Sequence, residues 1–153
     1  MDKNIRVSAL EIANWFVEKA SQTPENDLTN LKLQKLLYFA QGKFLATTGN
    51  PLFNEQIEAW VLGPVVRSVY DEFKSCGSFP ITAFDGKVKK SSLPANIDKF
   101  LINVWEEFGR YSANYLVDLT HKEGSPWETV YTKDKNSDIP FELMTKYFRS
   151  SVS

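Results

Sequence analysis

The chain has 153 residues, of which 42% are hydrophobic and 14% aromatic, and its 18 basic and 19 acidic residues leave a formal net charge of −1. This length is enough for one compact domain with its own core, and the near-neutral charge argues against nucleic acid as a partner. No apolar run approaches the roughly 20 residues of a bilayer-spanning helix, and no apolar signal segment follows the N-terminus, so we expect a cytoplasmic protein without a membrane partner. Cys76 is the single cysteine, so we expect no internal disulfide.

The first third of the chain predicts two helices. Ser8-Ala9-Leu10-Glu11 has the pattern of a capping box, and apolar residues recur at helical spacing from there to Ser21. Thr29 is the expected N-cap of a second helix, which ends at the stop signal Thr48-Gly49-Asn50-Pro51. Apolar residues cover most of the circumference of this second helix, which is typical of a helix in the middle of its domain.

The middle of the chain predicts short β elements around a third helix. Residues 56–62 alternate between apolar and other side chains and therefore predict a strand. Gly63-Pro64 predicts the start of a helix that runs to about Lys74, because proline is favoured at the first helical position. A small hairpin is expected near residues 81–90, about Asp85-Gly86.

The remaining residues predict four further helices. One runs from Pro94 to Gly109, a shorter one is capped by Ser112, and one or two turns follow Ser125-Pro126. Residues 132–138 read as a charged loop, and Ile139-Pro140 starts the final helix, which is expected from Phe141 to about Arg149. The sequence thus predicts a mainly α fold. We expect a single compact helical domain over residues 1–153, with its core at about 6–148, one central buried helix and minor short β elements near 56–62 and 81–90.

Candidate catalytic groups are sparse. His121 is the only histidine, and a metal-dependent hydrolase would have to combine it with Asp118 and Glu123. A structural role for His121 is the favoured interpretation. The glycines are isolated and form neither a dinucleotide fingerprint nor a phosphate loop, so we expect no cofactor and no metal.

Two tryptophans lie off the apolar stripes of their segments. Trp15 falls beside the stripe of the first helix, and Trp60 points opposite Val61 if its segment is extended. Exposed aromatic side chains are candidate anchors for a protein partner. The alternative is that both pack against the C-terminal segments.

Several motifs follow one another along the chain: Ser8-Ala9-Leu10-Glu11-Ile12-Ala13-Asn14-Trp15-Phe16, Leu28-Thr29-Asn30-Leu31-Lys32-Leu33-Gln34-Lys35-Leu36-Leu37-Tyr38, Pro51-Leu52-Phe53, Glu58-Ala59-Trp60, Gly63-Pro64-Val65-Val66 with Val69-Tyr70, and Leu119-Thr120-His121 with Ser125-Pro126-Trp127. In this order they resemble the Panacea domain, the family of the GepA-like phage-associated proteins and the SocA-like antitoxins. The resemblance covers about Arg6 to Phe148.

The resemblance implies a mostly helical antitoxin that neutralises a cognate protein toxin by direct contact, without a reaction or a cofactor. A proteolytic adaptor and another phage-encoded interaction module remain alternatives. We expect the partner to contact a surface around the second helix, the third helix and the Trp60 turn. The expected partner-binding residues are Lys32, Gln34, Lys35, Gln41, Trp60, Arg67 and Tyr70.

Overall fold

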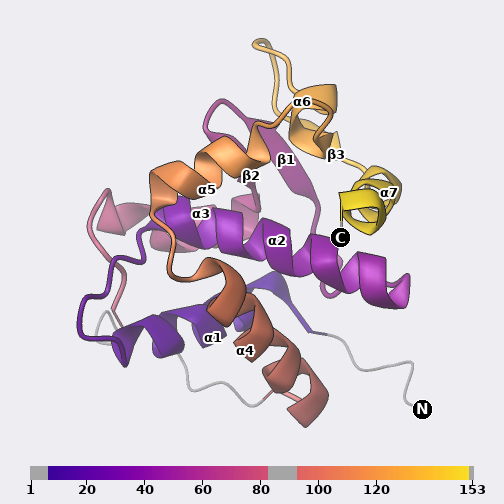
Figure 1. Ribbon diagram of the computed structural model, residues 1–153. Helices are drawn as coiled ribbons and strands as arrows, with labels where there is room; N and C mark the ends of the chain where they lie inside the picture. The colour runs from indigo at the N-terminus through magenta and orange to yellow at the C-terminus, as the bar shows by residue number, and fades with distance from the viewer. Residues whose placement is uncertain (1–6, 83–92, 152–153) are drawn as a thin grey trace.

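Helix α2 (Asn30–Thr48) passes through the middle of the molecule, and the other elements pack around it (Figure 1). The computed structural model describes residues 7–82 and 93–151. Thr29 caps α2, since its Oγ1 accepts a hydrogen bond from the amide of Lys32 at 3.2 Å. Thirteen of the 19 residues of α2 are buried, which confirms the expected central helix.

The elements follow one another in a mainly α order. They are α1 (Ala9–Ser21), α2, β1 (Ile57–Trp60), β2 (Gly63–Val65), α3 (Arg67–Phe73), the 3-10 helix η1 (Lys74–Cys76), α4 (Ala95–Phe108), α5 (Ala113–Thr120), α6 (Pro126–Val130), β3 (Ser137–Ile139) and α7 (Phe141–Ser151). No helix among the described residues is long and apolar enough to cross a bilayer. The mainly α fold class is confirmed.

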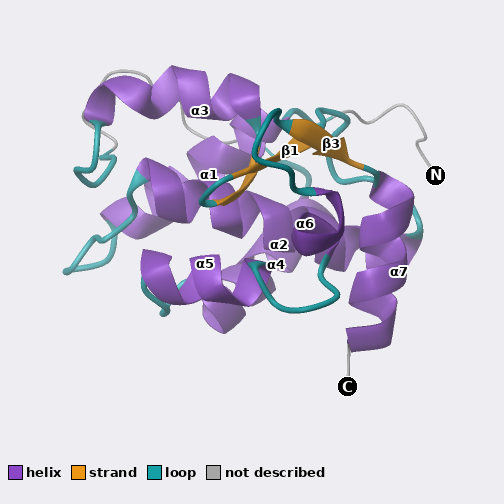
Figure 2. Ribbon diagram, turned by 90° about the horizontal axis from the view of Figure 1, so that it is seen from above, coloured by secondary structure: helices purple, strands orange, loops and turns teal. Residues whose placement is uncertain are grey.

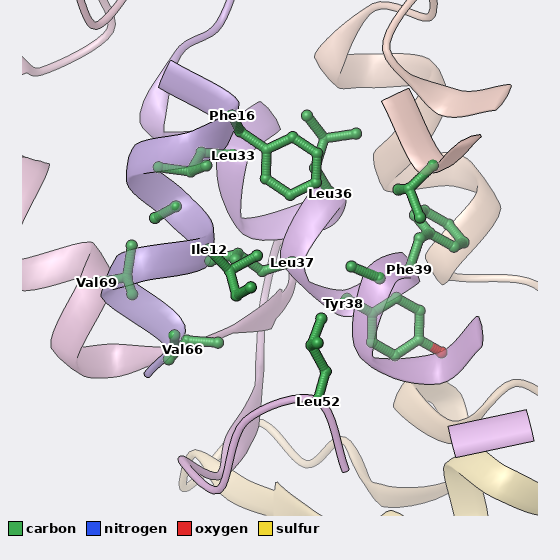
Figure 3. Close-up of a cluster of buried hydrophobic side chains, with 14 of the residues drawn as sticks. Ile12, Phe16, Leu33, Leu36, Leu37, Tyr38, Phe39, Leu52, Val66 and Val69 are labelled. Carbon is green, nitrogen blue, oxygen red and sulfur yellow. The ribbon is translucent and has the colours of Figure 1, made fainter. Parts of the chain in front are cut away.

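The core lies on two sides of α2. Figure 3 shows Ile12 and Phe16 of α1 on the same side as Leu33 and Leu37 of α2, and all four side chains are fully buried. On another side, the rings of Phe39 and Phe108 stack with their centroids 4.4 Å apart. Burying side chains of this size contributes about 1.5–3 kcal/mol each. Helix α2 is the common packing partner of α1, α3, α4, α5 and α7.

Helix α7 crosses α2 at Gly42. A Cβ atom at this position would overlap the ring of Phe148, so the close approach of the two helices requires glycine here. Phe148 also forms an edge-to-face contact with Tyr38, with ring centroids 5.4 Å apart. The C-terminal helix is therefore docked by aromatic packing, and the guanidinium of Arg149 adds a hydrogen bond to the carbonyl of Ala46 in α2 at 3.0 Å.

Three short strands form an antiparallel sheet in the order β2-β1-β3. In this sheet, Glu58 of β1 pairs with Val65 of β2 on one side and with Asp138 of β3 on the other side. Figure 2 shows β1 and β3 side by side, with α6 next to them. The strand expected near residues 56–62 is confirmed as β1, whereas residues 83–92, where most of the expected hairpin falls, lie outside the described residues.

Two expectations about local structure are wrong. Gly63-Pro64 belongs to strand β2 rather than to the start of a helix, and α3 begins at Arg67. Proline is tolerated there because β2 is an edge strand, where a missing N–H group need not break a ladder on both sides. The charged loop expected at 132–138 contains the first part of strand β3, which pairs with β1, whereas the final helix begins at Phe141 as expected.

The connection between α2 and β1 is held by one buried amide. Gln41 accepts hydrogen bonds from the amides of Leu52 and Phe53 at 2.7 and 3.3 Å and donates to the carbonyl of Phe53 at 2.7 Å. Its side chain is fully buried. The amide thus satisfies three backbone groups that water does not reach.

The substitution Gln41→Leu keeps the volume of this side chain and removes its hydrogen bonds. We expect the free energy of unfolding to fall by about 1–3 kcal/mol for each buried backbone group left without a partner. Chemical denaturation measures the change, with Thr47→Ala on the exposed side of the same helix as the control. Equal stability of Gln41→Leu and the wild type would contradict a bracing role for this amide.

Candidate partner-binding cleft

A cleft of about 450 Å³ opens between the N-terminal half of α2, the turn between β1 and β2, and the segment of α3 and η1. Figure 1 shows the β1–β2 turn and α5 on the same side of α2. Gln34 and Lys35 lie at the floor of the cleft, while Trp60, Tyr70 and the turn form its wall. Most of its lining is apolar, with a few polar groups, which is typical of pockets that bind a ligand or a partner.

The rim of the cleft carries a prearranged aromatic and cationic cluster. Arg67 donates to both carboxylate oxygens of Glu58, at 2.9 and 3.2 Å, and the indole of Trp60 donates to the same carboxylate at 2.9 Å. The guanidinium of Arg67 also lies 5.1 Å from the ring centroid of Trp60. The ring centroids of Tyr70 and Trp60 are 5.0 Å apart. Glu58 thus fixes both side chains before a partner arrives, which lowers the entropic cost of binding.

The tip of the β1–β2 turn exposes two aliphatic side chains. Val61 is 67% exposed and Leu62 is 53% exposed, and both line the cleft. Isolated exposed aliphatic residues are common, but here two adjacent ones lie beside Trp60 at the mouth of a cleft. This combination of apolar and aromatic side chains matches the composition of protein interfaces.

Lys35 lies under the turn with its side chain fully buried. Its ammonium donates to the carbonyl of Pro64 at 3.1 Å, and no ion pair of Lys35 is found among the described residues. Burial lowers the pKa of Lys35 to about 7. A Cβ atom at Gly63 would lie 2.6 Å from Cε of Lys35, so the turn covers the lysine closely.

His121 lies near Lys35 on the inner side of the turn. Its ring stacks on Trp127 with centroids 3.8 Å apart, and the indole of Trp127 donates to the carbonyl of Trp60 at 2.6 Å. Burial lowers the pKa of His121, and the charge of Lys35 lowers it further. No cluster of three His, Cys, Asp or Glu side chains suited to a metal ion occurs in residues 7–82 and 93–151, so Asp118 and Glu123 are not gathered with His121 into such a site.

The structure gathers five of the seven expected partner-binding residues. Gln34, Lys35, Trp60 and Tyr70 line the cleft, and Arg67 packs on Trp60 at its rim. Lys32 and Gln41 lie elsewhere along α2. Lys32 donates to the carboxylate of Asp27 at 2.8 Å and to the carbonyl of Gly109 at 2.7 Å, and Gln41 braces the loop that leads to β1.

The expected surface position of four of these residues is wrong. Lys32, Gln34, Lys35 and Gln41 are at most 1% exposed. The amide of Gln34 shows the reason, because it accepts from the amide of Val66 at 2.9 Å and donates to Asn30 at 2.9 Å. Chain segments cover α2 on the sides that carry these polar residues, and the polar heads bond the backbone of those segments.

Trp15, the other expected aromatic anchor, is also buried. It is 6% exposed, and its indole donates to Asp98 of α4 at 2.7 Å. The sequence analysis did not single out Val61 and Leu62, which line the cleft. The available signal was two adjacent aliphatic residues directly before Gly63, at the end of a short strand.

The buried charge of Lys35 predicts a pH dependence of stability. Lysine in the unfolded chain keeps a pKa near 10.5, so between pH 7 and 10 the unfolded state binds more protons than the folded state. Stability should therefore rise with pH across this range, by at most about 1.4 kcal/mol per pH unit from this group. The variant Lys35→Met should lose this component.

Denaturant unfolding of the wild type and Lys35→Met at several pH values between 7 and 10 measures the difference. Groups that do not interact with Lys35 contribute equally to both curves and cancel on subtraction. Parallel curves for the two proteins would show that Lys35 is equally protonated in the folded and unfolded states, contrary to its burial.

Comparisons with known proteins found a family model and a relative that match this chain. The family model described as "Antitoxin SocA-like, Panacea domain" matches residues 33–128, which include most of α2, the β1–β2 turn and most of the residues that line the cleft. The chain is 36% identical over 135 residues to a protein named Antitoxin SocA from Caulobacter vibrioides (strain NA1000 / CB15N), and the match covers 81% of this chain and 70% of that protein. No solved structure matches. The chain therefore belongs to the family of SocA-like antitoxins with a Panacea domain.

Proposed function

We propose that this chain is an antitoxin that neutralises a cognate protein toxin by direct binding, without a reaction of its own. The 36% identity to a protein named Antitoxin SocA carries this proposal. The toxin binds the surface formed by the β1–β2 turn, the cleft and the Trp60 cluster (Trp60, Arg67, Tyr70 and Glu58). That surface presents an arginine and two aromatic side chains, the residue types that dominate interface energies.

The rigid mounting of this surface supports the proposal. Arg67 and Trp60 share the carboxylate of Glu58, and Trp127 holds the backbone of Trp60 from behind. A partner therefore meets side chains that are already ordered. The exposed Val61 and Leu62 supply apolar area next to them.

Growth of cells that express the product of the adjacent gene, alone and together with this chain, tests the proposal. Toxicity of the neighbour alone, rescue by coexpression and recovery of both proteins in one complex are the expected results. A toxic neighbour that this chain neither binds nor rescues would contradict the proposal.

A negative charge at the tip of the turn should weaken the complex. The substitution Leu62→Asp places a carboxylate in the apolar part of the interface, where it would lose its hydration without gaining a partner. We expect loss of rescue and a shortened lifetime of the purified complex. Asn103→Asp introduces the same charge on the exposed side of α4, away from the cleft, and should leave rescue and complex lifetime unchanged.

Removal of the guanidinium should also weaken binding. For Arg67→Ala we expect a loss of roughly 1–3 kcal/mol in toxin binding with little change in melting temperature, because Arg67 is half exposed and its ion pair with Glu58 is a surface pair. Isothermal titration calorimetry measures the first quantity and thermal denaturation the second. A lower melting temperature with unchanged affinity would assign Arg67 a structural role instead.

A further inference from the structure

We infer that the toxin segment seated in the cleft carries a carboxylate next to apolar side chains. This inference rests on the proposed function and specifies the chemistry of the partner. It is based on the charges that line the cleft, on their incomplete compensation among the described residues and on the apolar wall beside them.

The charged side chains that line the cleft are both positive. Lys35 lies at the floor and Lys74 at the edge, and no Asp or Glu side chain lines the cleft among the described residues. An ammonium group in a concave surface with apolar walls raises the local electrostatic potential. Burial lowers the pKa of Lys35 to about 7, and an anion bound in the cleft favours its protonated form. Such a surface favours an anionic group and disfavours a cationic one.

The carboxylates nearby do not neutralise these lysines. Glu58 is shared by Arg67 and Trp60, and it does not line the cleft. Asp71 lies 3.8 Å from Lys74, but both side chains are more than half exposed, so this ion pair is weak. The ammonium of Lys35 donates a hydrogen bond to the carbonyl of Pro64 at 3.1 Å, and this carbonyl provides a dipole and not a counter-charge.

The cost of burying Lys35 is visible in its lowered pKa. An anionic group in the cleft offsets this cost, because opposite charges in a partly desolvated site stabilise each other more strongly than in water. Lys35 acts from beneath the cleft, since its side chain is fully buried, whereas the exposed Lys74 is placed to contact the carboxylate directly.

The wall of the cleft specifies the neighbours of that carboxylate. Val61 and Leu62 at the tip, together with the ring of Trp60, present apolar area within the same cleft. An acidic side chain alone would leave this area in contact with water. A segment with aliphatic or aromatic residues beside its Asp or Glu covers both features at once.

Selection of short random peptides displayed on phage tests the inference without the toxin. Peptides are selected on the immobilised full-length chain and counter-selected on Leu62→Asp, so that only those that use the cleft remain. We expect the retained peptides to carry Asp or Glu next to Leu, Ile, Val or Phe. Retained peptides that lack acidic residues, or the absence of peptides that depend on the cleft, would overturn the inference.

A synthetic peptide from this selection then identifies the groups responsible. We expect Lys74→Met and Lys35→Met each to weaken binding of this peptide about ten-fold, and Asn103→Asp to leave the binding unchanged. Replacement of the acidic peptide residue by its amide should weaken binding to the wild type but not to Lys74→Met. Equal affinity of the acid and amide peptides for the wild type would contradict the inference.

The two proposals fail in distinguishable ways. In one case the chain rescues growth, but the selected peptides show no acidic preference. This result would leave the antitoxin function standing and remove the inference about the partner's chemistry. Selective binding of acidic peptides together with no rescue from a toxic neighbour would retain the chemistry of the cleft and remove that neighbour as its occupant.

Discussion

Buried polar side chains on α2 hold the loops and strands that surround this helix. Gln41 satisfies backbone groups of Leu52 and Phe53, Gln34 satisfies the amide of Val66, and Lys35 donates to the carbonyl of Pro64. Unpaired backbone groups in such positions cost about 1–3 kcal/mol each, so a hydrophobic helix alone could not bury these segments. The position of the β1–β2 turn, and with it the shape of the cleft, depends on these bonds.

The cleft is consequently a rigid surface, although it is formed largely by short elements. Two supports act on the turn from beneath, Lys35 at the carbonyl of Pro64 and Trp127 at the carbonyl of Trp60. Glu58 adds a third by orienting Arg67 and Trp60 together. This arrangement suits the proposed binding of a partner, since a preordered surface loses little conformational entropy when a partner binds.

Local sequence patterns predicted the helices well, because caps and periodicity are properties of neighbouring residues. The capping box at Ser8 and Glu11 and the cap at Thr29 both form as expected. Strand β3 and the extended form of Gly63-Pro64 depend on pairing with β1, which local patterns do not contain. Trp60, Arg67 and Tyr70 were predicted as neighbours at one surface. The predicted surface position was wrong for four polar residues of α2: Lys32, Gln34, Lys35 and Gln41. A polar residue on a helix that is covered on nearly every side bonds buried backbone instead of solvent.

Hydrogen exchange of the free chain and of its complex with the toxin tests most directly whether the cleft is the binding surface. The account predicts that new protection in the complex is concentrated in the β1–β2 turn and in the segment of α3 and η1, whose residues line the cleft. Protection confined to α4 or α7, with the turn exchanging as in the free chain, would contradict it.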